Sequence, residues 1–210
     1  MTVDSGNPDA VFKITTQNDI KALDKVRVDG VAGASLTVAT SDLNTNAVSN
    51  IAVQGASLRN LNGDLTLATK TNAYLLNGAN VFTLAALAGA NANALGQIDS
   101  DNHIDLSNAS LLGRDVKLYA GQSPDRVPNI LNGKSQTDMT LVSIAGVSVP
   151  TASMVINEDN AIRLDGGSAV RSIRDVVMLA EEGIGGDDRA RTDGLVVNIG
   201  LIPYGMKPSG

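Results

Sequence analysis

The sequence lacks cysteine and tryptophan, and only five of its 210 residues are aromatic. Without cysteine, the chain forms no disulfide and no thiolate-bound metal site. An ordinary globular domain fills its irregular core with large aromatic side chains, so their scarcity argues against that class. The hydrophobic residues, 43% of the total, are mainly Ala, Val, Leu and Ile. Such small and medium side chains suit the narrow, regular interior of a β-repeat protein.

Basic residues are in deficit, since 16 Lys and Arg stand against 22 Asp and Glu, for a net charge of −6. A nucleic-acid partner needs a basic stripe, so we expect none. No apolar run reaches the length that a membrane-spanning helix needs, about 18 residues, so we expect no membrane insertion. A polybasic block that could tether the chain to a membrane is also missing. The first residues lack the basic and apolar regions of a signal peptide.

Short aliphatic segments recur along the chain, which is the main signal for its fold. One repeat type has two alternating aliphatic residues followed by a turn of small residues that contains Ser. Its copies begin at Val26, Ile51, Ile104 and Ile162. A downstream strand follows, with copies at Asp64–Leu67, Asp115–Leu118 and Asp175–Met178, and with Leu36–Val38 as a shorter equivalent. The copies at 104 and 162 also share an upstream Asp-Asn dipeptide.

A second repeat type lies between copies of the first and carries an Asn-Gly dipeptide before its second strand. Its two copies are Leu75–Gly78 leading to Val81–Leu84, and Ile130–Gly133 leading to Met139–Val142. Because the two Asn-Gly dipeptides recur at the same place in the repeat, we interpret them as equivalent corners rather than hairpin turns. The two repeat types alternate with a pair period of roughly 51 to 60 residues.

These repeats predict an all-β fold, a right-handed parallel β-helix (solenoid) of about seven coils with roughly 25 to 30 residues each. We expect residues 1–210 to form a single segment cut from a longer protein, with an irregular tail at 203–210. The first coil starts within Val11–Ile20. Three segments interrupt the pattern: Ala85–Gly96 as a short helix or an extruded loop, Tyr119–Pro128 as a surface excursion, and Glu181–Gly194 as a polar loop.

The segment Ser168–Gly183, with echoes near Asp64 and Asp115, resembles repeats of large bacterial filamentous adhesins. These include the two-partner-secretion haemagglutinins and the leukotoxin-type filamentous adhesins. The resemblance extends to most of the chain only in the style of its repeats. It implies a right-handed β-helix, export to the cell surface, and a role in adhesion or as a spacer. It brings no catalytic residues, and the secretion domain expected at the start of such proteins is missing here.

Three segments contain residue types that could serve a catalytic or metal site. His103 is the single histidine, and Ala161 takes its place in the sister copy, so we expect it to point outward into solvent. The acidic run Asp99–Asp105 has alternating oxygen ligands but lacks the glycine and the glutamate of a calcium loop, so we interpret it as an ordinary turn. Gly183–Asp188 is a single imperfect copy of a calcium nonapeptide, which is insufficient to complete a site.

Asp64, Asp115 and Asp175 recur immediately before strands and could line one face as a carboxylate ladder. We expect them on alternate coils, about 10 Å apart, which is too far for paired-carboxylate sugar hydrolysis. Capping of backbone N–H groups explains them more simply. Arg114 and Arg174 stand beside two of them, either as partners for an acidic sugar or as local charge balance.

The sequence therefore favours a non-catalytic β-helical segment of a bacterial cell-surface or secreted adhesin that acts as a shaft or spacer, with possible adhesive loops. We expect no enzyme activity, cofactor or metal. The expected partners are a receptor or glycan on a host or neighbouring cell, and the adjoining coils of the parent protein. Two alternatives stay open: a carbohydrate-active β-helix enzyme such as a polysaccharide lyase or hydrolase, and a purely structural extracellular repeat.

Overall fold

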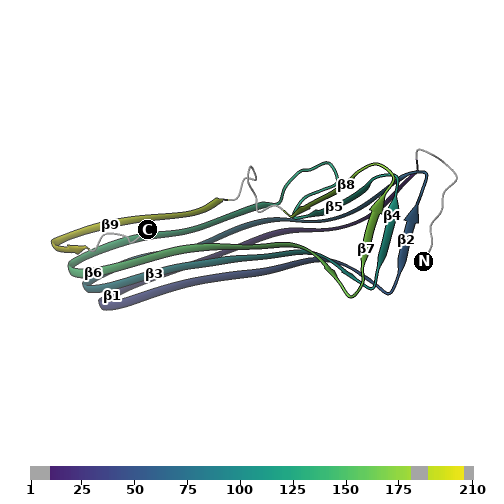
Figure 1. Ribbon diagram of the computed structural model, residues 1–210. Coiled ribbons are helices and arrows are strands. Elements are labelled where there is room, and N and C mark those ends of the chain that lie inside the picture. Colours follow the sequence, from purple (N-terminus) through teal and green to yellow (C-terminus); the bar gives the residue numbers. More distant parts are fainter. Residues whose placement is uncertain (1–9, 181–188, 206–210) are drawn as a thin grey trace.

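The computed structural model describes residues 10–180 and 189–205, and within these ranges the protein is all-β (Figure 1). Four segments are very long: β1 (Val11–Gln54), β3 (Asp64–Ser107), β6 (Ile130–Asp165) and β9 (Arg189–Gly205). With the short β5 (Val116–Ala120) and β8 (Val176–Ala180) they form one sheet system, in which all pairs are parallel. The described residues include no helix that could cross a membrane.

Each long strand bends back on itself at the end of the molecule far from β2, β4 and β7, so that it has an outgoing arm and a return arm (Figure 1). The ladder of paired residues omits one column at this bend, formed by Gly33, Ala86 and Ile144. The two arms of a strand lie face to face. In β3, for example, the side-chain amide of Asn77 donates to the backbone carbonyl of Leu95 over 2.6 Å.

Three short strands lie at the opposite end: β2 (Ser57–Asn60), β4 (Ser110–Gly113) and β7 (Ala169–Ser172). They form a separate parallel sheet in the order β2-β4-β7, across the gap between the two arms (Figure 1). The turns leading into these strands contain residues with positive φ, namely Gly55, Asn108, Gly166 and Gly167. Glycine and asparagine are the residues that adopt this conformation most readily, which explains their place at these corners.

Each long strand before β9 pairs in register with the corresponding segment one period later. Val11 in β1 pairs with Asp64 in β3, an offset of 53, and Asn72 in β3 pairs with Ile130 in β6, an offset of 58. Val116 in β5 pairs with Leu65 and with Val176, at offsets of 51 and 60. The predicted pair period is therefore confirmed. The predicted coil of about half that length is wrong, because segments at the shorter spacing are the two arms of one strand.

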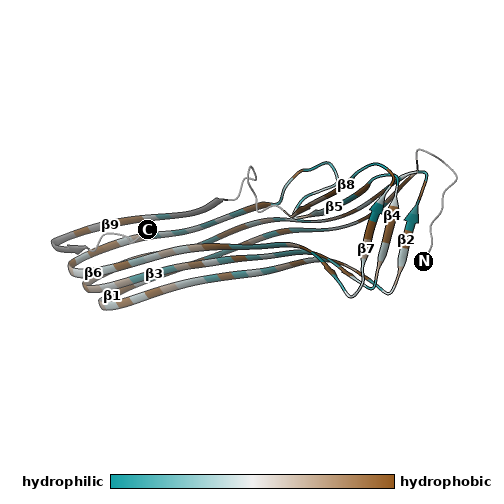
Figure 2. Cartoon of the chain, viewed as in Figure 1, coloured by the Kyte–Doolittle hydropathy of each residue, from teal (hydrophilic) through white to brown (hydrophobic). Residues whose placement is uncertain are grey.

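Apolar and polar residues alternate along the arms (Figure 2), so one set of side chains faces the interior between them. The widest part of the core lies next to the short strands, where Leu65, Ile104, Leu111 and Leu118 are completely buried. Toward the bend alanines such as Ala79, Ala90 and Ala92 make up most of the core cluster, beside Val81, Met139 and Leu141. The prediction of a narrow interior built from small aliphatics agrees with this packing.

Several repeat alignments from the sequence are confirmed. Ile51, Ile104 and Ile162 stack in one column, and Leu65, Val116 and Val176 stack in another. Val81 pairs with Met139 as expected. The loop between β5 and β6 coincides with most of the predicted excursion at Tyr119–Pro128, although Tyr119 itself belongs to β5 and is buried.

Other predictions are corrected by the structure. Val26 belongs to the outgoing arm and pairs with Ala79, so it is not a copy of Ile51. Asn77-Gly78 and Asn132-Gly133 lie within the outgoing arms of β3 and β6 and are not corners. Ala85–Gly96 is neither a helix nor a loop but part of β3 on both sides of its bend. β9 continues through Gly205, and the rest of the expected tail lies outside the described residues.

Candidate functional site: a groove on the outer face

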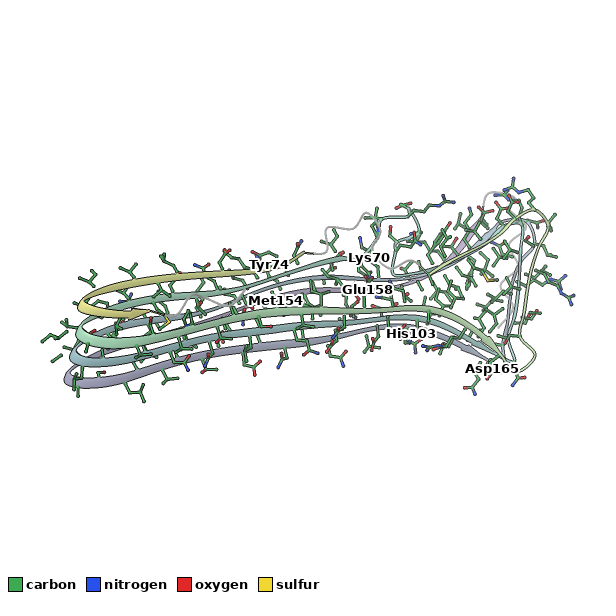
Figure 3. All side chains as sticks on the ribbon, turned by 60° about the vertical axis from the view of Figure 1, so that its left-hand side comes forward. Lys70, Tyr74, His103, Met154, Glu158 and Asp165 are labelled. Carbon is green, nitrogen blue, oxygen red and sulfur yellow. The ribbon has the colours of Figure 1, made fainter. Side chains whose placement is uncertain are left out.

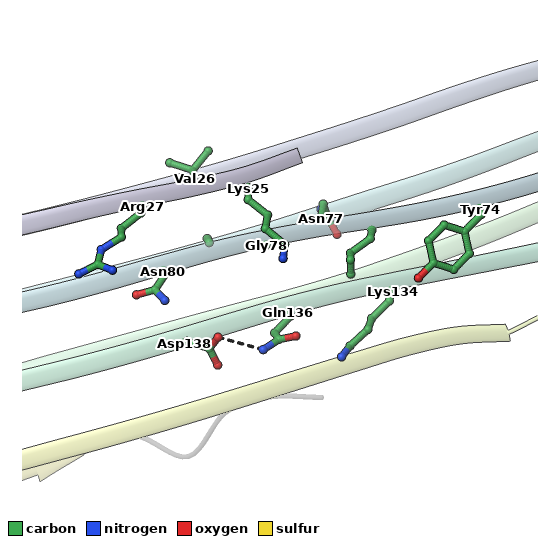
Figure 4. Close-up of a pocket in the computed structure, with 12 residues that line it drawn as sticks. Lys25, Val26, Arg27, Tyr74, Asn77, Gly78, Asn80, Lys134, Gln136 and Asp138 are labelled. Carbon is green, nitrogen blue, oxygen red and sulfur yellow. Dashed lines mark hydrogen bonds between the residues drawn. The ribbon is translucent and has the colours of Figure 1, made fainter. Parts of the chain in front are cut away.

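A groove of about 410 Å³ opens on the outer face of the outgoing arms, around Gly78 (Figure 4). Lys25 and Arg27 on β1 line one side, and Lys134, Gln136 and Asp138 on β6 line the other. The floor belongs to β3, with Tyr74, Leu76 and Asn80. The volume of the groove falls within the range of small-molecule pockets, about 300 to 1,000 Å³.

The groove exists because one position in a column of outward side chains is empty. Lys25, Gly78 and Gln136 are direct neighbours across β1, β3 and β6. The first and third carry long side chains and the middle residue carries none, which leaves a notch between them (Figure 4). On one side of the notch stands the ring of Tyr74, which is 46% exposed.

The charged side chains that line the groove are mostly cationic, with Lys25, Arg27 and Lys134 against Asp138, although the chain as a whole is acidic. The ammonium group of Lys134 lies 2.9 Å from a carboxylate oxygen of Asp193 in β9, and Arg27 pairs with Asp29 at 3.1 Å. Gln136 donates to the carboxylate of Asp138 over 2.9 Å. Lys25 is exposed and forms no ion pair within 4 Å among the described residues. The groove thus offers a cation, planar amides and an aromatic face together.

His103 lies on the outer face of the return arm, as expected, and its direct neighbour in the ladder is Ala161 (Figure 3). Its side chain is only 17% exposed because it has partners. Nε2 lies 3.0 Å from a carboxylate oxygen of Asp159, and Nδ1 lies 3.1 Å from Nη1 of Arg163. This arrangement is a surface cluster of charged side chains, in which the two ring nitrogens contact Asp159 and Arg163 and not a hydroxyl group of the described residues.

The acidic run Asp99–Asp105 is part of β3 and not a turn, so its side chains alternate between the two faces. Ser100 and Asn102 point into the interior and are buried. Within residues 10–180 and 189–205, no group of three His, Asp or Glu side chains is placed to hold a metal ion. Gly183–Asp188 lies outside the described residues.

We call the strands within one pair period a layer. Asp64 and Asp115 lie on directly adjacent layers, since β3 pairs with β5 immediately after them. The expectation that they lie on alternate coils is therefore wrong. Each carboxylate is bound by an arginine from the next layer. Nε of Arg114 donates to Asp64 over 3.1 Å, and Nε of Arg174 donates to Asp115 over 2.9 Å.

These ion pairs lower the pKa values of the two carboxyl groups. The pKa of Asp115 is lowered mainly by the hydrogen bond from Arg174, against an opposing effect of burial. For Asp64, burial is the largest single influence and raises the pKa. The bonds from Lys117 and Arg114 outweigh it together, so that the pKa is lowered overall. Both groups stay ionised at neutral pH, and the local charge balance suggested for Arg114 and Arg174 takes the form of bonds between layers.

A buried polar layer crosses the interior between the arms, and sequence reasoning missed it. Asn102 is completely buried; its oxygen accepts from the hydroxyl of Thr71 over 3.0 Å, and its amide donates to Asn160 Oδ1 over 2.9 Å. The side-chain amide of Asn160 in turn donates to Glu158, which is labelled in Figure 3, over 2.7 Å. The shared Asp-Asn dipeptide of the two copies was the available signal, because its Asn is the stacked residue.

In comparisons with known proteins, no family model, no curated protein and no solved structure matches the chain. The groove, the ion pairs and the buried polar layer therefore carry the functional interpretation by themselves.

Proposed function

We propose that the chain is a non-catalytic segment of a right-handed parallel β-helix from a bacterial filamentous adhesin, secreted or held at the cell surface, where it acts as a shaft. The observation that supports this proposal best is the continuous register. β1, β3 and β6 each lie beside the corresponding segment one period later, in unbroken register along most of their paired length. A protein that repeats one layer in this way extends in a single direction.

In this proposal, one turn of the helix consists of an outgoing arm, a return arm and one short strand, and it takes up one pair period. The described strands run from Val11 to Gly205. This span then corresponds to between three and four turns instead of the expected seven. Each turn would advance the shaft by about 4.8 Å, the spacing of hydrogen-bonded strands.

Polar side chains that could have served catalysis are used instead to join one layer to the next. The Arg174–Asp115 pair and the Asn102–Asn160 bond both connect residues about one period apart. A glycoside hydrolase needs a general-acid carboxyl group whose pKa is raised. The pKa values of Asp64 and Asp115 are lowered, which supports the shaft over a hydrolase that uses either of these two acids.

The outer edge of β1 supports the idea that further turns adjoin this one. Among the described residues, β1 pairs with β3 on one side and with no strand on the other. Its inward residues Ile14, Ile20 and Val26 are half-buried, whereas their direct neighbours Leu67, Ala73 and Ala79 in β3 are buried. An additional turn of the parent protein that paired with β1 would cover these side chains and satisfy its backbone groups.

Immunogold labelling tests the proposal. Antibodies raised against the purified chain are applied to intact and to permeabilised cells of the bacterium that encodes it. We expect gold on intact cells, along structures that project from the surface or in shed material. Label that appears only after permeabilisation would refute a surface role.

An assay for cleavage tests the non-catalytic part separately. The purified chain is incubated with a panel of neutral and acidic polysaccharides, and reducing ends and unsaturated products are measured over time. We expect neither product above the level given by heat-denatured chain. Turnover that disappears in Asp64→Asn or Asp115→Asn would overturn the proposal in favour of an enzyme.

A further inference from the structure

We propose that the groove around Gly78 binds an acidic saccharide, a sugar chain that carries carboxylate groups. This inference gives the proposed shaft a ligand and therefore rests on the proposed function. Its basis is the unexplained glycine in the middle of the outgoing arm of β3, together with the side chains that surround it.

Glycine inside a strand is unfavourable by roughly 0.5 to 1 kcal/mol relative to alanine, so it calls for a structural reason. The φ angle of Gly78 does not lie in the left-handed region. A Cβ atom at this position would meet its nearest neighbours, the Gln136 carbonyl oxygen and Lys25 Cγ, at 3.7 and 3.8 Å, which is ordinary contact. Neither backbone conformation nor crowding therefore requires glycine here.

Two other glycines within the long arms have a visible reason. Cβ atoms at Gly96 and Gly133 would lie 2.3 and 2.4 Å from the side chain of Met154, which fills the space that these two glycines leave inside the protein. The space beside Gly78 faces outward and belongs to the groove, with the side chain of Lys25 at its edge (Figure 4). Glycine inside a strand often marks a bulge, a tight bend, or a place where a ligand or another backbone approaches closely. The pairing of Gly78 with β1 and β6 is unbroken, so neither a bulge nor a bend accounts for it.

The chemistry around the notch fits a sugar acid. The exposed ammonium group of Lys25 is available to a carboxylate, whereas the charge of Arg27, two residues further along the same strand, is already paired with Asp29. The amides of Asn80 and Gln136 can both donate to and accept from hydroxyl groups. The ring of Tyr74 provides a flat apolar surface against which the C–H face of a sugar can pack.

An acidic peptide fits this surface less well. Peptides commonly add to a sheet by hydrogen bonding to a free backbone edge. At Gly78 the backbone is already paired with β1 on one side and with β6 on the other. Recognition must use side chains alone, and an aromatic face between amides serves a hydroxylated ring better than an extended backbone.

The test is a titration of the folded chain with three probes, in which binding is measured by isothermal titration calorimetry. The probes are a hexasaccharide of galacturonic acid, a neutral hexasaccharide of glucose and a hexapeptide of glutamate. We expect the acidic hexasaccharide to bind at least tenfold more tightly than either of the others, and to weaken as salt is raised. Absence of binding by the acidic hexasaccharide would overturn the inference. So would equal binding of the neutral sugar, or equal or stronger binding of the peptide.

Variants locate the binding. Gly78→Leu fills the notch, and its matched control is Gly33→Leu, at a site where a Cβ atom has no neighbour within 4 Å. Lys25→Gln removes the exposed cation, and its matched control is Lys13→Gln, an exposed lysine of the same strand outside the groove. We expect each groove variant to lose at least tenfold in affinity and each control to bind like the parent chain. Equal affinity of Gly78→Leu and the parent would refute the location.

Circular dichroism checks that each variant is folded, and if Gly78→Leu is not, Lys25→Gln decides alone. The outcome is separable from that of the proposed function. Binding at the groove by a protein that immunogold places inside the cell would leave the site intact and refute the adhesin. Surface labelling without saccharide binding would support the adhesin and refute the site.

Discussion

Met154 and the two glycines around it allow a sharp test of the packing between the arms. Met154 projects from the return arm of β6 and is 8% exposed. Gly96 lies beside it in β3, and Gly133 lies in the outgoing arm of β6. We consider the variants Gly133→Ala and Met154→Ala, singly and together.

A Cβ atom at Gly133 would lie 2.4 Å from Met154 Sδ and 2.7 Å from its Cγ, well inside van der Waals contact. The Cγ atom cannot swing away as freely as the end of the side chain. Overpacking of this kind lowers the free energy of unfolding by about 1 to 3 kcal/mol. Met154→Ala alone leaves a cavity and lowers it by about 2 to 5 kcal/mol.

In the double variant the Met154 side chain, with which the added Cβ atom would clash, is absent, and the new methyl group occupies part of the cavity. Alanine also restricts the unfolded chain more than glycine does, which favours the folded state by up to about 1 kcal/mol. We therefore expect the double variant to be at least as stable as Met154→Ala. The coupling free energy between the two sites is then about 2 kcal/mol, in the direction of mutual rescue.

Urea unfolding of the four proteins, followed by circular dichroism, measures this coupling, provided that the slopes of the transitions agree. Gly78→Ala is the matched control, because the added Cβ has room there and we expect no loss of stability. Effects of Gly133→Ala and Met154→Ala that add within about 0.5 kcal/mol would refute the packing proposed between the arms.

Two further predictions concern the polar contacts between layers. Asn102→Ala removes the buried hydrogen bonds that Asn102 forms with the Thr71 hydroxyl, Ser100 and Asn160, so we expect the free energy of unfolding measured in urea to fall by about 3 kcal/mol; a fall of less than about 1 kcal/mol would contradict the buried layer. The folded-state pKa of Asp115 is lowered, so its contribution to stability is present above its ordinary value of 3.8 and is lost as the pH falls below that value. The free energy of unfolding of Asp115→Asn should therefore fall less than that of the parent chain as the pH is lowered through this range. An equal fall in both proteins would show that Asp115 is not a source of the pH dependence.

The sequence predicted the period of the fold correctly because the columns that stack are chemically conspicuous. Ile51, Ile104 and Ile162 repeat an aliphatic residue at a fixed place, and an Asp-Asn pair precedes the last two. The folding back of each strand was not predictable in the same way. In the sequence, the outgoing arm and the return arm of one strand resemble two successive coils, each about half as long as the period of the fold.

The Ala-rich segment shows why the bend was missed. Before Ala86 the buried positions are odd-numbered, as at Thr83 and Ala85; after it they are even-numbered, as at Ala90 and Ala92. A change of phase breaks the two-residue alternation on which a strand prediction depends. Alanine itself favours helices, so composition also indicated the wrong structure. Pairing with β1 and β6 on both sides overrides that preference.

The groove at Gly78 escaped sequence reasoning for a related reason. Its lining comes from three strands that meet only through pairing between segments one period apart. An Asn-Gly dipeptide is typical of a tight turn, so the sequence offers a local explanation for this glycine that hides its place in the groove. In the structure the Asn faces inward, where its oxygen accepts from the Ser135 hydroxyl over 2.6 Å, and the Gly faces outward. The same two residues thus join one layer to the next inside the protein and open the groove outside it.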